Sequence, residues 1–379
     1  MERWHADPTK YLRSTSMMRW QGERLTREDL GDLRMVGSGA FGMVYRGRVQ
    51  AKGGGVQGEP PRWVALKVLE SMDNRTARED FMSELNLMRL LYHPNLVRCL
   101  GGDTRQLASP DEESYSSAWG ASPMKGAPAA GGSIRDGGEQ GAPPTEQLSE
   151  QSLAQGLASK EAYVVTEWLG GGTLARRIFN PENGFRMSER TILRNTLQVT
   201  RGLVYLHSCE PCVVHRDIKP ANLIFADDGH TLKLADFGLA RFIDDDDMTG
   251  VTGSFRWMAP EVLKGQAYGP PVDLYSLGMV VYSMTSSEMP FPHKGELQAA
   301  TLMAQGLRPV LPRSTSPDLT EIIRACWAHA PEKRPTASAV AFMCERALRL
   351  RNVDPDAVPA TPLAGAAGAA APGCGCAIM

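Results

Sequence analysis

The chain is organised around residues 213–225, which read Val213-Val214-His215-Arg216-Asp217-Ile218-Lys219-Pro220-Ala221-Asn222-Leu223-Ile224-Phe225. Apolar residues stand at both ends, and charged or titratable side chains and one amide lie between them. This pattern is typical of a polar loop held between two buried segments, an arrangement that fixes reactive side chains in place. The stretch therefore predicts a site of chemistry, and a charged surface loop is the alternative interpretation.

A glycine-rich stretch lies far upstream of this loop. It reads Val36-Gly37-Ser38-Gly39-Ala40-Phe41-Gly42-Met43-Val44, and we expect a strand, a tight turn and a second strand. Glycines allow backbone amides to approach phosphate oxygens closely. Dinucleotide-binding folds use the same glycine spacing, but there a helix begins at the third glycine. Because Val44 and Tyr45 continue a strand pattern here, the dinucleotide interpretation is disfavoured.

Two charged residues stand at positions that are otherwise apolar. Lys67 lies in the alternating strand pattern of residues 63–69, and Glu84 lies on the apolar stripe of a helix that a capping box at residues 76–79 would begin. A buried charge is costly unless it is paired. We therefore expect a Lys67–Glu84 ion pair.

These motifs and two later ones occur in the order found in protein kinases. Residues 215–222 resemble the catalytic loop of that family, residues 236–238 (Asp-Phe-Gly) resemble its magnesium-binding tripeptide, and residues 258–261 read Met-Ala-Pro-Glu. The amino-acid sequences at 255–261 and around Arg334 resemble those of the tyrosine-kinase-like group of Ser/Thr kinases. This group includes Raf-like and mixed-lineage members. The resemblance implies an α+β, bilobal kinase fold, with a small β-rich N-lobe carrying one regulatory helix and a larger helical C-lobe.

The 379-residue length, with 42% apolar residues, is enough for two lobes. We expect an N-terminal extension at 1–29, a kinase domain at 30–350 and a flexible tail at 351–379. Within the domain, the N-lobe would span 30–169 and the C-lobe 170–350. Residues 104–159 are rich in Gly, Pro, Ser and Ala, which predicts a largely disordered insert with a short helix at 145–159. Strands are expected at 93–100 and 163–169, and long amphipathic and buried helices at 188–208 and from Pro271.

The resemblance also implies residue roles. Asp217 would take the proton of the substrate hydroxyl, Lys219 would neutralise the transferred phosphoryl group, and Asn222 and Asp236 would hold Mg²⁺. The implied ATP contacts are Val36, Gly37, Ser38, Gly39, Ala40, Phe41, Gly42, Met43, Val44, Ala65, Lys67, Glu84, Thr166 as gatekeeper, Glu167 and Trp168 as hinge, and Ile224. The implied structural and regulatory residues are His215, Arg216, Phe237, Gly238, Glu261, Asp273, which would hold the catalytic loop, and Arg334, which would pair with Glu261.

The function that follows is an ATP- and Mg²⁺-dependent protein Ser/Thr kinase in intracellular signalling. Lys219 favours Ser or Thr as the acceptor, and dual specificity stays open. The alternative is a pseudokinase-type scaffold, whose usual mark is a lost catalytic residue, and none is lost here. Cys99 stands where the family has a larger apolar residue, in the spine of side chains that reaches Phe237. This smaller side chain would tune activity by loosening the packing.

Regulation is expected in the activation segment. Thr249 and Thr252 are the candidate phosphosites, with Arg216 as the cation that a phosphate would meet. A carboxylate from the four aspartates at 244–247 is the rival partner for Arg216. Ser254 is expected instead to line the catalytic cleft beside Lys219.

Charge and cysteine content bear on partners and location. A net charge of −2 implies no nucleic-acid partner, and seven cysteines without an apolar run in residues 1–30 indicate reduced thiols in the cytoplasm. The terminal residues Cys376-Ala377-Ile378-Met379 form a farnesyl-type prenylation signal, with a chance ending as the alternative. One lipid binds only reversibly, so Cys374 is expected to carry a second, acyl chain. Lipid-modifying enzymes and a membrane surface are therefore expected partners, besides ATP and a protein substrate.

Overall fold

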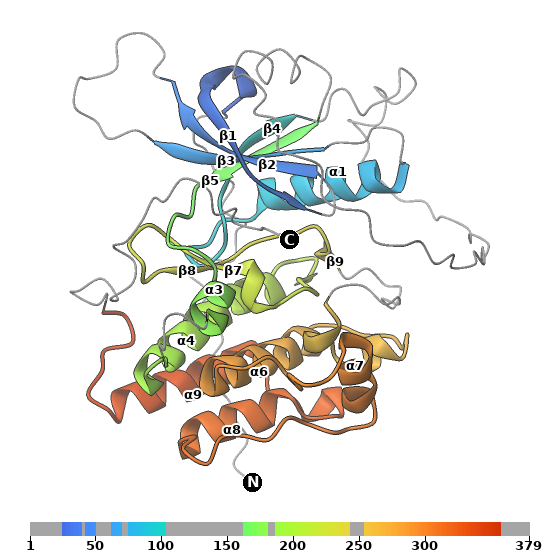
Figure 1. Ribbon diagram of the computed structural model, residues 1–379, viewed down its shortest axis with the longest axis vertical. Helices are drawn as coiled ribbons and strands as arrows, with labels where there is room; N and C mark the ends of the chain where they lie inside the picture. The colour runs from blue at the N-terminus through green and yellow to red at the C-terminus, as the bar shows by residue number, and fades with distance from the viewer. Residues whose placement is uncertain are drawn as a thin grey trace.

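The computed structural model describes residues 25–39, 42–50, 62–69, 75–103, 162–180, 186–242 and 254–357. These residues form two lobes, an upper one built on a β-sheet and a lower one that is mainly helical (Figure 1). The predicted kinase fold class is thus confirmed. The residues after β5 (Tyr163–Glu167) carry the chain from the upper lobe into the lower one.

The upper lobe contains a five-stranded antiparallel sheet of order β1-β2-β3-β5-β4. Its other strands are β1 (Leu30–Gly39), β2 (Gly42–Val49), β3 (Trp63–Val68) and β4 (Cys99–Asp103). Burial alternates along β3, as expected for a strand with one face against a core. The strands predicted at 63–69 and 163–169 are therefore present, each slightly shorter.

The strand expected at 93–100 begins only at Cys99, as β4. Leu96 and Val97 face the lower lobe instead, where the Val97 amide donates to the Leu234 carbonyl at 2.9 Å. The apolar run therefore serves two purposes, since its first part joins the lobes and only its second part enters the sheet.

Helix α1 (Arg75–Leu90) lies along the underside of the sheet (Figure 1). The predicted stripe is buried, with Phe81 and Leu85 almost fully enclosed, and Glu84 is buried on the same face. Helical spacing puts the glutamate and these apolar side chains on one side, which turns the carboxylate toward β3.

Both ends of the packed region extend slightly beyond residues 30 and 350. Leu25 is buried in the core of the upper lobe, and its amide donates to the Leu100 carbonyl at 2.9 Å. The short helix Arg27–Asp29 follows it and is closed by a capping box between Thr26 and Asp29. At the other end, Val353 is buried and Arg351 pairs with Glu189 at 2.7 Å.

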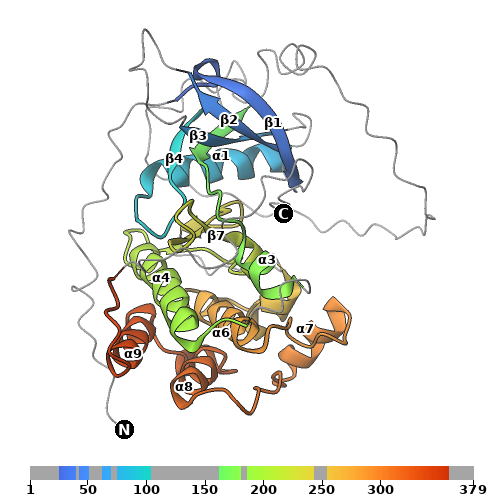
Figure 2. The ribbon, with the colours of Figure 1, turned by 60° about the vertical axis from the view of Figure 1, so that its left-hand side comes forward.

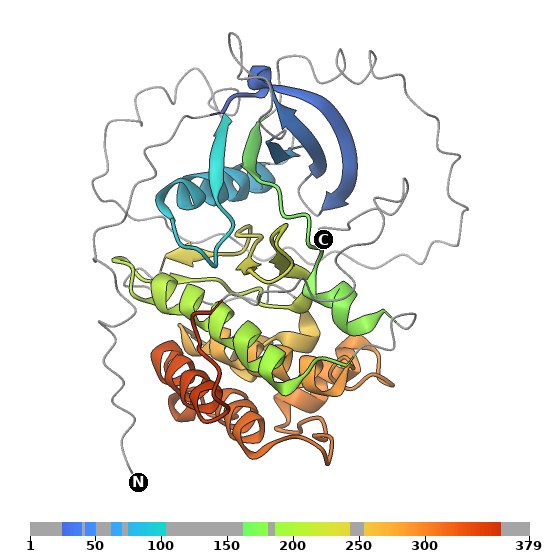
Figure 3. The same ribbon diagram turned by 90° about the vertical axis from the view of Figure 1, so that its left-hand side faces the viewer.

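The lower lobe is built around helix α6 (Pro271–Ser286), which is buried on nearly all sides. Figure 2 shows it between α4 and α8, while Figure 3 shows α4 beside α9. The helices around it are α3 (Leu174–Phe179), α4 (Glu189–His207), α5 (Pro260–Leu263), α7 (Glu296–Ala304), α8 (Pro317–Cys326) and α9 (Ala337–Arg349). Gly278 lets α8 approach α6 closely, because a Cβ there would lie 2.8 Å from the Cβ of Cys326.

Helix α4 delivers the chain to the polar loop that dominates the sequence. Its predicted bounds are confirmed: Ser188 caps its first turn by accepting from the Thr191 amide, and Ser208 closes its last turn. Two short antiparallel pairs of strands then flank the loop. They are β6 (Val213–Val214) with β9 (Arg241–Phe242), and β7 (Leu223–Phe225) with β8 (Leu232–Leu234).

Residues 1–24, 104–161 and 358–379 lie outside the described residues, and so does the helix predicted at 145–159. Within the described ranges, none of the helices combines the length and the apolar character needed to cross a membrane.

Candidate active site

The polar loop at 215–222 is held from below by one carboxylate. Asp273, in the first turn of α6, accepts hydrogen bonds from the backbone amides of His215 at 3.0 Å and Arg216 at 2.9 Å. The Nε2 atom of His207, at the end of α4, lies 2.8 Å from the same carboxylate. Burial alone would raise the pKa of Asp273, but the hydrogen bond and charge of His207 outweigh it and lower that pKa. Asp273 therefore stays ionised and fixes the loop, as the family resemblance implies.

Three polar side chains of the loop meet above this anchor. The Oδ2 atom of Asp217 accepts from Lys219 Nζ at 2.8 Å and from Asn222 Nδ2 at 2.9 Å. Lys219 Nζ also donates to Ser254 Oγ at 2.9 Å, so Ser254 lines this cleft as predicted. Within the described part of the chain, the buried Oδ1 atom of Asn222 has no hydrogen-bond partner. An unused acceptor therefore remains beside Asp217.

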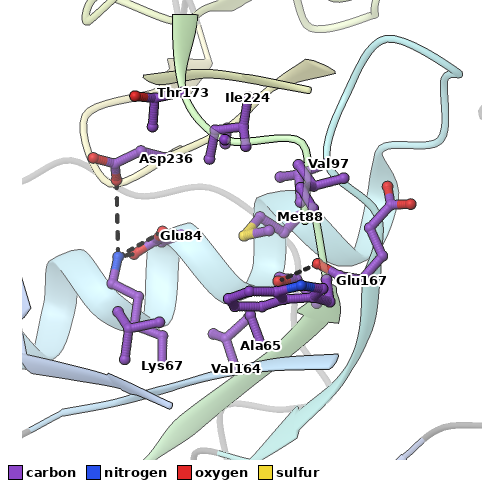
Figure 4. A pocket seen from close by; sticks show the side chains of 16 residues that line it. Ala65, Lys67, Glu84, Met88, Val97, Val164, Glu167, Thr173, Ile224 and Asp236 are labelled. Carbon is purple, nitrogen blue, oxygen red and sulfur yellow. Dashed lines mark hydrogen bonds and ion pairs between the residues drawn. The ribbon is translucent and has the colours of Figure 1, made fainter. Parts of the chain in front are cut away.

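Across the cleft, Lys67 on β3 pairs with Glu84 on α1, as the sequence predicts. The Nζ atom lies 2.9 Å and 2.7 Å from the two carboxylate oxygens of Glu84, and 3.8 Å from Oδ1 of Asp236 (Figure 4). Burial alone would lower the pKa of Lys67, but the charges of Glu84 and Asp236 raise it above its ordinary value. The lysine is therefore held as a cation.

A mostly apolar pocket lies between the two lobes, and Figure 4 shows Lys67, Glu84 and Asp236 at one end of it. Its walls come from Val44, Ala65, Lys67, Glu84, Met88, Val97, Val164, Thr166, Glu167, Trp168, Leu169, Gly172, Thr173, Ile224, Ala235 and Asp236. The sequence singled out nine of these as ATP or metal contacts. It missed Met88, Val97, Val164, Leu169, Gly172, Thr173 and Ala235. Two of these could have been found from their distance to a motif, because Met88 lies one helical turn after Glu84 and Ala235 directly precedes Asp236.

The glycine-rich residues belong to the hairpin that β1 and β2 form. Val36 and Gly37 belong to β1, where Gly37 pairs with Val44 and Ser38 pairs with Met43 of β2. Among these residues, Val36, Gly37 and Met43, whose burial the structure describes, do not belong to the pocket walls. Ala40 and Phe41 lie outside the described residues. Nucleotide contacts from this hairpin therefore stay a prediction.

The side chain of Glu167, the predicted hinge residue, accepts two hydrogen bonds. The Oε1 atom of Glu167 accepts from the backbone amide of Arg98 at 2.8 Å and from Lys233 Nζ at 2.6 Å. Lys233 lies on β8 of the lower lobe, so this side chain ties the two lobes together at the back of the pocket. Thr166, the predicted gatekeeper, donates its hydroxyl to the Glu167 carbonyl at 3.3 Å.

The remaining predicted residues form supports around the site. The His215 ring lies edge-on to Phe237, with centroids 5.0 Å apart, and burial lowers the pKa of His215. Cys99 is buried in the same core as Phe237. The Gly238 amide lies 3.5 Å from Oδ1 of Asp236.

The Glu261–Arg334 ion pair is also present and is buried, with Nη2 2.8 Å from Oε2. It joins α5 to the segment that precedes α9.

Arg216 is held by the Leu239 carbonyl and by the Tyr268 hydroxyl, the latter at 3.0 Å. Its predicted phosphorylated partners Thr249 and Thr252, and the rival aspartates at 244–247, lie outside the described residues. The same is true of Cys374 and Cys376. Regulation and lipidation at these residues stay predictions.

Comparison with known proteins shows the family to which a chain with this arrangement of residues belongs. Residues 151–343 match the family described as protein kinase domain, and residues 31–108 match the family described as protein tyrosine and serine/threonine kinase. The chain therefore belongs to the protein kinase family.

Its relatives include Raf-like kinases of the tyrosine-kinase-like group. The serine/threonine/tyrosine-protein kinase HT1 of Arabidopsis thaliana is 28% identical over 355 residues, which cover 91% of this chain and 74% of HT1. The serine/threonine-protein kinase VIK of the same plant is 30% identical over 81% of this chain and 58% of its own length. The corresponding values for the serine/threonine-protein kinase CTR1 are 28%, 82% and 31%. The chain thus spans little more than half of VIK and about a third of CTR1.

Replacing Asp273 by Asn tests the anchor of the loop. The amide keeps one acceptor oxygen but loses the charge and leaves amide donors less well paired, so we expect the free energy of unfolding to fall by about 1–3 kcal/mol at pH 7. Because the folded-state pKa of Asp273 is lowered, its contribution is present above the unfolded pKa of about 3.9 and is lost as the pH falls through the folded value. The stability difference between wild type and Asp273→Asn should therefore shrink below about pH 4.

Chemical denaturation of both proteins from pH 7 to pH 3 measures this difference. Asp228→Asn is the control, because Asp228 accepts backbone amides of His230 and Thr231 in the β7–β8 turn, away from the loop. The kinase activity proposed below should persist in that variant and be mostly lost in Asp273→Asn. Equal stability of Asp273→Asn and wild type at pH 7 would contradict the anchoring role.

Proposed function

We propose that the chain is an ATP- and Mg²⁺-dependent protein kinase that transfers the γ-phosphoryl group of ATP to Ser or Thr hydroxyls. Membership of the family implies ATP and a protein as substrates. The observation that supports an active enzyme is the convergence of Lys67, paired with Glu84, and Asp236 on one side of the cleft with Asp217 and Lys219 on the other. A binding scaffold needs no such set of charges.

The Lys67 ammonium is suited to the phosphates of the nucleotide. It is fixed by two contacts to Glu84 at the inner end of the pocket, so it presents a positive charge without a cost of reorganisation on binding. The apolar walls formed by Val44, Ala65 and Ile224 are suited to the adenine ring. We propose that the nucleotide lies with its base among these walls and its phosphates toward Lys67.

Asp217 is suited to receive the proton of the acceptor. In the transfer, the acceptor oxygen bonds to the γ-phosphorus while the bond from that phosphorus to the β–γ bridging oxygen breaks. The hydroxyl proton passes to the Asp217 carboxylate, whose orientation is fixed by Asn222. Lys219 lies beside it and offsets the negative charge of the transferred group.

The residues present fit the expected magnesium. The buried Oδ1 of Asn222 lacks a partner among the described residues, and Asp236 offers a partly exposed carboxylate. Oxygen ligands of these two kinds are those that Mg²⁺ accepts. Asn222 and Asp236 would hold the ion, which when bound neutralises phosphate charge.

The acceptor is proposed to be Ser or Thr because Lys219 is held between Asp217 and Ser254. By resemblance, Ser/Thr members of the family carry a lysine at the position of Lys219. The name of HT1 includes tyrosine, so tyrosine acceptors belong in the substrate test. We further propose a role in intracellular signalling, on the strength of the relatives alone.

Replacing Asp217 by Asn is expected to lower kcat by at least about a hundredfold, because the proton acceptor is lost while the shape is kept. Transfer of labelled γ-phosphate to a panel of Ser-, Thr- and Tyr-containing peptides measures it. Glu332→Gln, on an exposed carboxylate far from the loop in sequence, is the control and should match wild type. If wild type and Asp217→Asn incorporate equally little phosphate while ATP still binds, the pseudokinase-type scaffold is the correct function.

Membrane attachment by lipid is the last part of the proposal and depends on the sequence alone. A farnesyl group on Cys376 and an acyl group on Cys374 should hold the protein at a membrane together, because one chain binds only reversibly. Mass spectrometry of the C-terminal peptide from cells, with fractionation of Cys374→Ser and Cys376→Ser, tests it. Both variants should leave the membrane fraction. An unmodified peptide that still ends in Met379 would contradict the attachment.

A further inference from the structure

One wall of the pocket contains a tryptophan whose ring contacts an arginine. Trp168 follows β5 and lines the pocket. The guanidinium carbon of Arg46, on β2, lies 5.2 Å from the centre of the Trp168 ring and 3.8 Å from the centre of the Trp63 ring on β3. Arg46 therefore connects two strands of the sheet with the segment that leads into the lower lobe.

The strand register places Arg46 on the face of the sheet that looks into the pocket. Arg46 pairs directly with Ala65, and Val44 pairs directly with Lys67. Directly opposed residues of antiparallel strands project to the same face, and Ala65, Val44 and Lys67 all line the pocket. Arg46 thus lies on the same face, beside Ala65 and two residues along β2 from Val44, the partner of Lys67.

The environment of Arg46 gives it little to bind except the two rings. Its Nε atom is buried and has no hydrogen-bond partner within the described ranges. Arg34, directly opposite on β1, carries the same charge and repels it. Attraction between a cation and the faces of indole rings therefore accounts for its position, and this attraction strengthens where the cation is shielded from water.

We propose that Arg46 is a positioning residue for nucleotide binding, which holds the Trp168 ring in place as one wall of the pocket. The proposal rests on the proposed function, in which this pocket binds ATP. Trp168 would contact the base side of the nucleotide, whereas Asp217 and Lys219 act on the phosphoryl group. Loss of Arg46 should therefore weaken ATP binding and leave the rate at saturating ATP unchanged.

Replacement by Met tests this, because it keeps the length of the side chain and removes the charge. We expect Arg46→Met to raise the KM for ATP about threefold to tenfold, the range that one or two such contacts give. The kcat at saturating ATP and the KM for the peptide should stay as in wild type. Arg46→Lys keeps a cation and should recover part of the affinity.

Arg48→Met is the matched control. Arg48 lies two residues along β2 on the same face, is half exposed, and contacts Asp32 at 3.9 Å. Its replacement removes the same charge from the same strand and leaves the contact between Arg46 and the Trp168 ring in place, so the KM for ATP should not change. Equal effects of Arg46→Met and Arg48→Met would show that only the general positive field matters, and would overturn the proposal.

A double-mutant cycle completes the test. If Arg46 acts through Trp168, Arg46→Met should have little further effect in a Trp168→Ala background. Independent, additive effects on the dissociation constant of ATP, measured by calorimetry, would contradict it, and so would an unchanged KM in Arg46→Met. Calorimetry also separates the two claims, because wild type that binds no ATP refutes the proposed function, whereas wild-type binding that Arg46→Met leaves intact refutes only this inference.

Discussion

The ion pair between Lys67 and Glu84 is the contact on which the arrangement of the site depends. It joins the central strand of the sheet to the only helix that the described residues place beneath it, and both partners belong to different folding elements. Removing one member of a buried pair costs about 3–5 kcal/mol, because the other charge is left uncompensated. The glutamate therefore fixes the rotation of α1, and this rotation also brings Met88 into the pocket wall.

The lower lobe supports the site by an independent contact. Asp273 binds two consecutive backbone amides of the catalytic loop, and α6, which carries it, is buried on nearly all sides. In the proposed function, the upper lobe would position the nucleotide through Lys67, and the lower lobe would position the acceptor through the loop that Asp273 holds. The two meet at Asp236, which lies 3.8 Å from Lys67. Glu167 and Lys233 add a bond between the lobes at the back of the pocket.

Much of this could be predicted from the sequence, because local signals were strong. The amphipathic pattern of residues 188–208 predicts α4, and the Lys67 and Glu84 charges, each costly alone in a buried position, predict an ion pair. What the sequence did not predict depends on residues distant in the chain. The displaced β4 arises because Val97 bonds Leu234, and the stacking of Arg46 depends on the register of three strands. Neither contact leaves a periodic pattern in one sequence.

The most direct test of the account is the effect of Glu84→Gln on kcat/KM for ATP. Glutamine has the same shape but no charge, so Lys67 would lose its fixed anionic partner while the core keeps its packing. A hydrogen bond to a charged group contributes about 1.5–3 kcal/mol. The account therefore predicts a fall of roughly ten- to a hundredfold in kcat/KM. The melting temperature should also fall, because the Lys67 charge loses its partner, so the rates are compared well below it. A Glu84→Gln protein with the wild-type kcat/KM would contradict it.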